Sequence, residues 1–495
     1  MTSPVAKITI TATHTVHSEH PITLQDPFVL GPFDQLGHFA TPVNAVWIYE
    51  SSSSTDFIPF ERLRIAISRL LDYYPHLTGR LHIDPETDVR SMTKLGTGIH
   101  LLEATCDAPL RSFASRSSSA GQEYSVFNFP ELGNGLLSPW DMSLEGAQRD
   151  PVFTIQRTEF ACSAVAIGMR LSHAVSGAGG FLGLYQDLAE IYGAAGTAHR
   201  GPIELTSPPY LPPFMITHML HMDAEQREKA LSEQPAAYSV RKPEAAAESS
   251  PATEAHIQQE NPKPDPLMGR SLRFSPSAIA TLKGQAVNPE STSARASTFT
   301  ALSAHFWQRT HRARLAQVQP GSNEEQQKEF LSSAFGTSVN FVPHLGLPPR
   351  SFGNTIVTPV VELESQELAH APLWKIADII NSRIRHVSAG ETHRLGSWIA
   401  AQPKKSHIQL RFPCTPASFI ATGWHHFPLY SGADLDESPV FASPVLMEPL
   451  FDGMIVFVEP KAKDGGVEAV ASMKCSTWDI LDNDEEFINV WDRKS

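Results

Sequence analysis

The chain has 495 residues, which is enough for two or three domains of ordinary size. Its formal net charge of -14, without any run of lysines and arginines, excludes nucleic acid and anionic membranes as partners, because both are bound through basic patches. The four cysteines lie far apart, no secretory signal pattern opens the chain, and no apolar run approaches the roughly 20 residues of a membrane helix, so we expect a cytoplasmic protein with free thiols.

The first part of the chain predicts strands and one amphipathic helix. Apolar and polar residues alternate over 6–17, and residues 43–49 form a second run of strand-forming residues. Apolar residues then recur at helical spacing over 60–74, where Pro75 ends the helix. A further strand is expected over 153–160.

The stretch that follows carries the main functional candidate. Residues 162–171 are mostly small and apolar, which predicts a strand buried on both faces. That strand ends at His173, and the glycine-rich segment 176–180 leads into apolar residues at helical spacing from Phe181 onward. A histidine in a loop at a strand end is typical of a catalytic group, although a core histidine with a satisfied ring is the alternative.

A change of composition divides the chain into two halves. From about residue 206 prolines accumulate, and residues 233–267 are rich in Glu, Pro, Ala and Ser with few large apolar residues, so they cannot bury enough surface to fold. We therefore expect an N-terminal domain over 1–205 that carries His173, a crossover over 206–269 with a flexible linker at 233–267, and a C-terminal domain over 270–495. The second half predicts strands at 270–275, 407–412, 417–422, 454–458 and 467–474, and helices at 276–285, 297–314 and 370–395.

Six segments in the right order resemble the BAHD acyltransferases, including their fungal members. In the family motif His-x-x-x-Asp-Gly, His173 occupies the histidine position and Gly177 stands where the aspartate is expected. The other matching segments are Leu30-x-x-x-Asp34, Leu70 to Leu81 with Tyr74-Pro75 and Gly79-Arg80, Leu302 to Arg314 with Trp307, Phe352-Gly353-Asn354, and Thr422-Gly423-Trp424. Of the family's Asp-Phe-Gly-Trp-Gly only Asp434 is kept.

This resemblance implies a fold and a reaction. The fold would be α/β with mixed sheets, in two chloramphenicol-acetyltransferase-like domains that are joined by a long crossover and enclose a tunnel at their interface. An acyl-CoA co-substrate would enter from one mouth and a small-molecule alcohol or amine from the other, with no bound cofactor and no metal. His173 would remove the acceptor's proton, since an imidazole has a pKa near neutral pH. The Thr422 hydroxyl and the Trp424 indole N–H would stabilise the oxyanion, and Phe33 would contact substrate.

Three further positions are expected to be structural: Gly177, Asn340 and Asp434. In the family the motif aspartate pairs with an arginine from the other half, and Asn340 or Val342 stands where the family carries arginines. The two losses are consistent with each other, because a remaining buried and unpaired arginine would cost several kcal/mol. We expect Gly177 and Asn340 to face each other.

Other motifs fail. The glycines after His173 do not continue into a dinucleotide loop, because position 182 is Leu182, and Ala174 replaces the first glycine of a nucleophile elbow. The leading hypothesis is an acyl-CoA-dependent O- or N-acyltransferase of secondary metabolism, acting as a monomer. Two alternatives stay open: an enzyme on the same fold that uses His173 for a proton-transfer or cyclisation reaction without CoA, and a non-catalytic binder.

Overall fold

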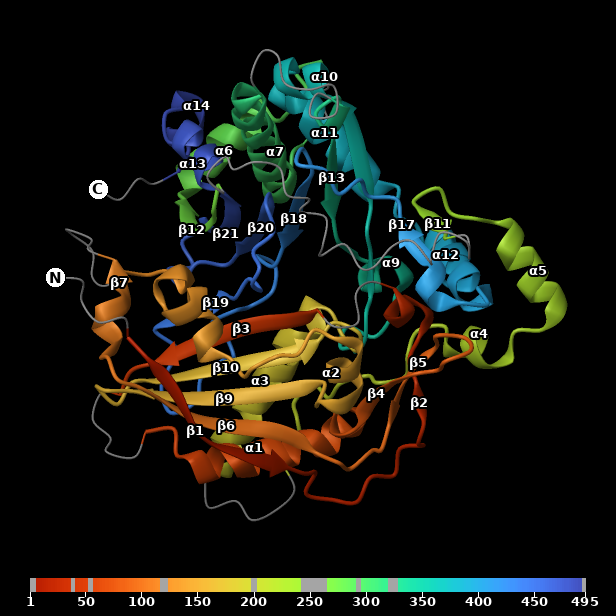
Figure 1. Ribbon diagram of the computed structural model, residues 1–495, viewed down its shortest axis with the longest axis vertical. Coiled ribbons are helices and arrows are strands. Elements are labelled where there is room, and N and C mark those ends of the chain that lie inside the picture. The colour runs from red at the N-terminus through yellow and green to blue at the C-terminus, as the bar shows by residue number, and fades with distance from the viewer. Residues whose placement is uncertain are drawn as a thin grey trace, which may run out of the picture.

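Two six-stranded mixed sheets organise the protein (Figure 1). The computed structural model describes residues 6–36, 41–51, 57–115, 123–196, 203–241, 265–290, 295–318 and 328–491. The sheet of the N-terminal half lies at the bottom of the view, the sheet of the C-terminal half stands above it, and a smaller helical lobe projects to the right. Each half therefore has its own sheet and its own hydrophobic core.

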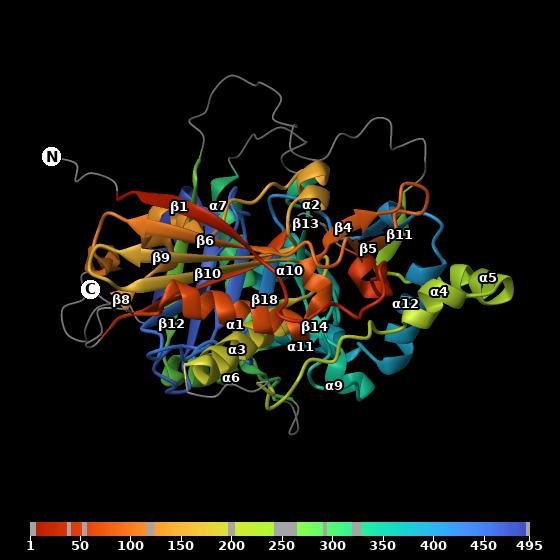
Figure 2. The same ribbon diagram turned by 90° about the horizontal axis from the view of Figure 1, so that it is seen from below.

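The N-terminal sheet has the strand order β1-β6-β9-β10-β3-β19. Strand β10 is central, and all eight of its residues are buried, as its small apolar sequence predicts. Helices α1 and α3 pack against one face of this sheet (Figure 2). The elements are β1 (Ile8–Val16), β3 (Pro42–Tyr49), α1 (Phe60–Tyr73), β6 (Ile99–Cys106), α2 (Leu144–Arg149), β9 (Phe153–Phe160), β10 (Val165–Ser172), α3 (Ala178–Ala195) and β19 (Phe441–Pro444), with a small sheet of β2 (Phe28–Val29), β5 (Arg90–Thr93) and β4 (Arg80–Ile83).

The central strand is shorter than its sequence predicts. It begins at Val165 instead of residue 162, because Ser163 adopts a left-handed φ of 64° and turns the chain. Cys162 is therefore exposed in that turn. At its other end the strand reaches Ser172, and Gly177 caps the start of α3, so His173 lies in the loop that joins them.

The C-terminal sheet has the strand order β12-β21-β20-β18-β13-β16. The helix predicted over 370–395 is two helices, since Ser388 starts the second with a capping box to Glu391. The elements are β12 (Leu267–Phe274), α6 (Pro276–Gln285), α7 (Thr298–Gln317), β13 (Ser332–Thr337), β16 (Val360–Glu364), α10 (Ser365–His370), α11 (Leu373–Arg385), α12 (Ala389–Ala401), β18 (Phe419–Gly423), β20 (Met454–Val458), β21 (Val467–Lys474), α13 (Cys475–Leu481) and α14 (Glu485–Ile488).

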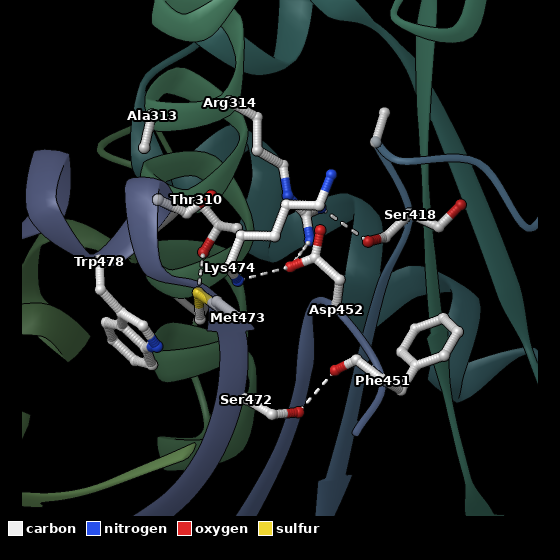
Figure 3. Close-up of polar contacts among 12 residues, drawn as sticks. Thr310, Ala313, Arg314, Ser418, Phe451, Asp452, Ser472, Met473, Lys474 and Trp478 are labelled. Carbon is white, nitrogen blue, oxygen red and sulfur yellow. Dashed lines mark hydrogen bonds and ion pairs between the residues drawn. The ribbon is translucent and has the colours of Figure 1, made fainter. Parts of the chain in front are cut away.

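Arg314, the last residue of the family-like segment Leu302 to Arg314, anchors α7 to this sheet (Figure 3). Arg314 is buried, and its guanidinium donates to the Ser418 carbonyl at 2.8 Å and lies 3.0 Å from the Asp452 carboxylate. Asp452 in turn accepts from the backbone N–H of Lys474, where β21 ends. The motif residue thus joins the helix to loops at the ends of two strands.

A third, smaller core lies in the helical lobe and includes part of the crossover. Strand β11 (Tyr238–Val240) pairs with β17 (Ile408–Leu410), so the interval 233–267, expected to be a flexible linker, contains a paired strand. Residues 242–264 of that interval lie outside the described residues. The lobe's other elements are α4 (Ile216–His221), α5 (Ala224–Ser232), α9 (Val342–Leu345) and the two-stranded sheet of β14 (Val339–Asn340) and β15 (Ile356–Val357).

The C-terminal half contributes one strand to the N-terminal sheet. Strand β19 comes from the C-terminal half but pairs antiparallel with β3 at the edge of the N-terminal sheet. The Trp47 indole N–H donates to the Leu429 carbonyl at 2.9 Å, and the Tyr49 hydroxyl donates to the Ala433 carbonyl at 2.6 Å. The expected boundary at residue 270 therefore does not separate two independent sheets.

Candidate active site

His173 is fixed by a side chain from the other half of the molecule. Its Nδ1 lies 3.1 Å from Oδ1 of Asn354, and its backbone N–H donates to the Thr41 carbonyl. Nδ2 of Asn354 donates both to the His173 carbonyl at 2.7 Å and to Asp34 Oδ1 at 2.9 Å. Because both of these partners are acceptors, the Asn354 oxygen must face His173, and Nδ1 of the ring must carry the hydrogen. Nε2 is left with its lone pair, which is the form a general base needs.

Asp34 completes this arrangement from the N-terminal half. It is buried at 4% exposure, and its carboxylate accepts from the backbone N–H groups of Asn354 and Gly31 as well as from the Asn354 amide. Burial raises the pKa of Asp34 to about 7, against the opposing effect of these hydrogen bonds. The carboxyl group therefore orients Asn354, which in turn orients the imidazole.

Burial also acts on His173. It lowers the pKa of the ring below its usual value, while hydrogen bonds to its own carbonyl and to Asn354 act in the opposite direction. Because its pKa is lowered, the imidazole is neutral at physiological pH and can accept a proton.

The expected partnership of Gly177 and Asn340 is not present. A Cβ at Gly177 would lie 3.6 Å from Asn354 Oδ1 and 3.9 Å from His173 Cε1. Asn340 is instead exposed, and its side chain accepts from the backbone N–H of Val342. The glycine therefore faces the hydrogen-bonded pair itself, and Asn354 occupies the place that counting along the chain assigned to Asn340.

Trp424 approaches the same loop from the C-terminal sheet. Thr422 lies in β18, opposite Val456 of β20, and Trp424 directly follows that strand. The Trp424 ring packs 6.3 Å from Phe181, in the first turns of α3. The segment with both predicted oxyanion donors thus contacts the first turns of α3, the helix that follows the His173 loop.

Phe33 lies mainly in the core of the helical lobe. Its ring packs 4.7 Å from Phe341 and 6.0 Å from Phe214. It also lines a cavity of about 160 Å³ together with Asp34 and Asn354. A second cavity of about 220 Å³ includes Ser172, the residue before His173, in its lining. Cavities therefore adjoin both the strand end and the network around the histidine, while a continuous tunnel stays a prediction.

Comparisons with known proteins show which family the chain belongs to. A model of the Transferase family matches residues 6–488. The chain belongs to this family, the BAHD acyltransferases. An Omega-hydroxypalmitate O-feruloyl transferase of Arabidopsis thaliana is 25% identical over 449 residues, covering 87% of this chain and 84% of the relative. A Hydroxycinnamoyl-CoA:5-hydroxyanthranilate N-hydroxycinnamoyltransferase of Avena sativa is 26% identical over 451 residues, covering 88% and 89%.

Solved structures show that the BAHD acyltransferase has the expected fold. TRI101 of F. graminearum, solved with coenzyme A and T-2 mycotoxin, matches with a TM-score of 0.66 at 17% identity, over 94% of this chain and 99% of TRI101. Vinorine synthase matches with a TM-score of 0.64 at 15% identity, over 99% of both chains. The predicted two-domain α/β fold is thereby confirmed. Among the described residues, none of the helices combines the length and apolar character that crossing a membrane requires.

The aspartate that anchors the segment before β19 is not the predicted one. Asp434 is exposed, whereas Asp436 accepts from the Ile58 backbone and the Tyr192 hydroxyl and pairs with Arg62 at 2.7 Å. The side chain that ties this segment of the acyltransferase to the N-terminal half therefore lies two residues later in the chain.

Two residues of the active-site network were missed as functional in the sequence. Asn354 and Asp34 both lie in segments that resemble the family, but no role followed from their positions. The intact Phe352-Gly353-Asn354 triplet, next to altered motifs, is the signal that could have identified Asn354.

Proposed function

We propose that this acyltransferase moves an acyl group from an acyl-CoA to a hydroxyl or amine of a small molecule, with His173 as the general base. The observation that carries the proposal is the fixed tautomer: Asn354 holds the hydrogen on Nδ1, which leaves Nε2 free to accept a proton. The relatives' names describe transfer of acyl groups to oxygen and to nitrogen, and TRI101 was solved with coenzyme A and a small molecule.

The reaction balances with this one imidazole. Nε2 accepts the acceptor's proton while the acceptor oxygen or nitrogen attacks the thioester carbonyl, and the resulting oxyanion receives hydrogen bonds from Thr422 and Trp424. The C–S bond then breaks, and the imidazolium returns the proton to the leaving thiolate. Free coenzyme A and an ester or amide are the products, so thiol release and product formation must proceed at equal rates.

The test compares wild-type protein with His173→Gln, which keeps the ring's approximate size but has no basic nitrogen. Acetyl-CoA and feruloyl-CoA are supplied with a panel of hydroxylated and amino compounds, and thiol release is measured with product mass. We expect kcat to fall by roughly 10²- to 10⁴-fold with little change in substrate binding.

The exposed His20 provides a matched control, because His20→Gln changes a histidine outside the network. It should leave turnover unchanged. Turnover by wild-type protein without any thioester would support instead a proton-transfer reaction on the same fold. Undiminished turnover by His173→Gln would remove the histidine from the chemistry.

A further inference from the structure

The carboxyl group of Asp34 has only donors as hydrogen-bond partners. Its Oδ1 accepts from the backbone N–H of Asn354 at 2.7 Å and from the Asn354 amide at 2.9 Å, and its Oδ2 accepts from the Gly31 N–H at 3.0 Å. Because each of these partners donates, a proton on Asp34 would have no acceptor among them. The arrangement therefore suits the ionised form of the side chain, a carboxylate.

Among the described residues, no cation forms an ion pair with this carboxylate. Asp34 and Asp187 are the buried acidic side chains in that part of the chain, and Asp187 pairs with Arg350. Arg90 of β5 is the charged group that acts on Asp34, but its guanidinium donates to the backbone carbonyls of Asp34 and Leu36, at 3.0 Å each. A buried anion without a paired cation is costly, so its presence points to a role other than stability.

The proposed reaction creates a positive charge close to this anion, on His173. One amide separates the two groups: Asn354 Oδ1 lies 3.1 Å from His173 Nδ1, and Asn354 Nδ2 donates to Asp34. Burial disfavours the imidazolium and lowers the pKa of the ring, so the charged ring needs an anion nearby. Of the described side chains that line the cavity next to Asp34, no other carries a charge.

We propose that the Asp34 carboxylate is the counter-charge of the His173 imidazolium and acts on it through the Asn354 amide. In the reaction Nε2 takes the acceptor's proton and later returns it to the thiolate, while Asp34 stays ionised and no proton crosses the amide. Asp34 is a positioning residue, because it acts through Asn354, and its charge stabilises the ring once the proton has been transferred. This inference rests on the proposed function and adds an electrostatic effect to the orientation of Asn354.

The pH dependence of the rate should report both groups, since the reaction needs a neutral His173 and an ionised Asp34. Burial raises the pKa of Asp34 to about 7, so the carboxylate takes up a proton and the counter-charge is lost as the pH falls through this value. The ring of His173, whose pKa burial lowers, is also protonated as the pH falls. In wild-type protein the acidic limb should therefore begin near pH 7 and approach a slope of about two in the logarithm of the rate.

Asp34→Asn removes the charge and keeps an oxygen that accepts hydrogen bonds. Above about pH 8, kcat should fall by about 10- to 100-fold with little change in KM, because the imidazolium forms only as the reaction proceeds. The acidic limb should move to lower pH and keep a slope of about one. The matched control is Asp187→Asn, which alters the other buried carboxylate and should lower stability while leaving the limb in place. Coincident acidic limbs in wild-type protein and Asp34→Asn would overturn the proposal.

Nitrogen-15 NMR of labelled histidine measures the same coupling without any substrate. In Asp34→Asn the pKa of the His173 ring should fall by about half a unit or more, because the imidazolium loses a nearby anion. An unchanged pKa would refute this inference alone, since the proposed function is tested separately by His173→Gln.

A second variant keeps the test valid if Asp34→Asn fails to fold. Asp34 lines the cavity of about 160 Å³, so a small anion can reach the position that Asp34→Ala vacates. Formate restores a carboxylate there, whereas formamide has a similar size and no charge. We expect formate to raise the kcat of Asp34→Ala by about 10-fold and formamide by less than about twofold. Recovery with formate no greater than with formamide would overturn the proposal.

Discussion

At the scale of single residues, an amide side chain orients the imidazole of His173, the proposed base. Asn354 both accepts from the ring and donates to Asp34, so its orientation cannot reverse without placing two acceptors against each other. This arrangement resembles a base held by a third group, in which the ring's tautomer is set by the hydrogen bond on its other nitrogen. The pH dependence of the reaction should therefore respond to Asn354 in a defined direction.

Asn354→Asp places a negative charge beside Nδ1 and removes the donor to Asp34. An adjacent anion stabilises the imidazolium, so the pKa of His173 should rise. The proposed reaction needs the neutral ring. As the pH is lowered, the rate should therefore begin to fall at a higher pH than in wild-type protein. We expect the acidic limb of the pH–rate profile to move up by about one unit or more. Asn354→Leu removes the hydrogen bond that raises the pKa, so its limb should move down or stay. Shifts of equal sign in both variants would contradict the assigned tautomer.

At the scale of elements, the loop before Asn354 is anchored to α3. Arg350 lies 2.5 Å from the Asp187 carboxylate, which also accepts from the Tyr74 hydroxyl at 2.5 Å. Phe352 packs its ring edge-on against Tyr74 at 5.0 Å. An ion pair between the halves thus exists in this protein, although its members are not the Gly177 and Asn340 positions.

Arg350→Met should leave the Asp187 carboxylate buried without its cation and destabilise the protein by about 3 kcal/mol. Burial already raises the pKa of Asp187 to about 6, against Tyr74 and Arg350, and loss of the arginine should raise it further. A carboxyl with a raised pKa takes up a proton as pH falls, so the loss should be larger at pH 8 than at pH 5. Denaturant unfolding of wild-type protein and Arg350→Met at both pH values measures this loss of stability.

The companion variant is Arg350→Met with Asp187→Leu, in which both charges are gone. Replacing a buried pair by apolar groups is often neutral, so most of the stability should return. Strictly additive losses in this double-mutant cycle would show that the two side chains do not interact.

At the scale of the whole molecule, we expect the two halves to unfold together, because they share a sheet. Strand β19 closes the N-terminal sheet with residues from the C-terminal half, and the Tyr49 hydroxyl bonds to Ala433 across the same boundary. Neither half can unfold without breaking buried hydrogen bonds of the other. Separate unfolding of the expected domains 1–205 and 270–495 is therefore not expected.

Tyr49→Phe should reduce the free energy of unfolding by about 1–3 kcal/mol, because the Ala433 carbonyl loses its buried donor and the buried Tyr185 hydroxyl loses its partner at 2.7 Å. Scanning calorimetry should show one transition, shifted as a whole. Tyr73→Phe is the matched control, since the Tyr73 hydroxyl donates to the Ile203 carbonyl within the N-terminal half and is only partly buried, so its loss should cost less. If calorimetry resolved two transitions and Tyr49→Phe shifted only one of them, the shared N-terminal sheet would not be a source of cooperativity.

The sequence by itself determined the local elements and the loop position of the proposed base, His173. Hydrophobic periodicity is a property of neighbouring residues, so it placed α1, β9, α3 and α7 and left His173 in a loop between a buried strand and a helix. Motifs with a fixed spacing within one element, such as Trp307 and Arg314 in α7, could likewise be recognised from the sequence.

The tertiary structure alone decided which distant side chains meet. Asp34, His173 and Asn354 come from three segments far apart in the chain, and a hydrogen-bond partner depends on the path of the backbone between them. Counting along the chain for this reason selected Asn340 instead of Asn354, and Asp434 instead of Asp436. No local pattern in the sequence showed that β19 joins the N-terminal sheet, because an edge strand pairs with whichever sheet the folded chain brings it to.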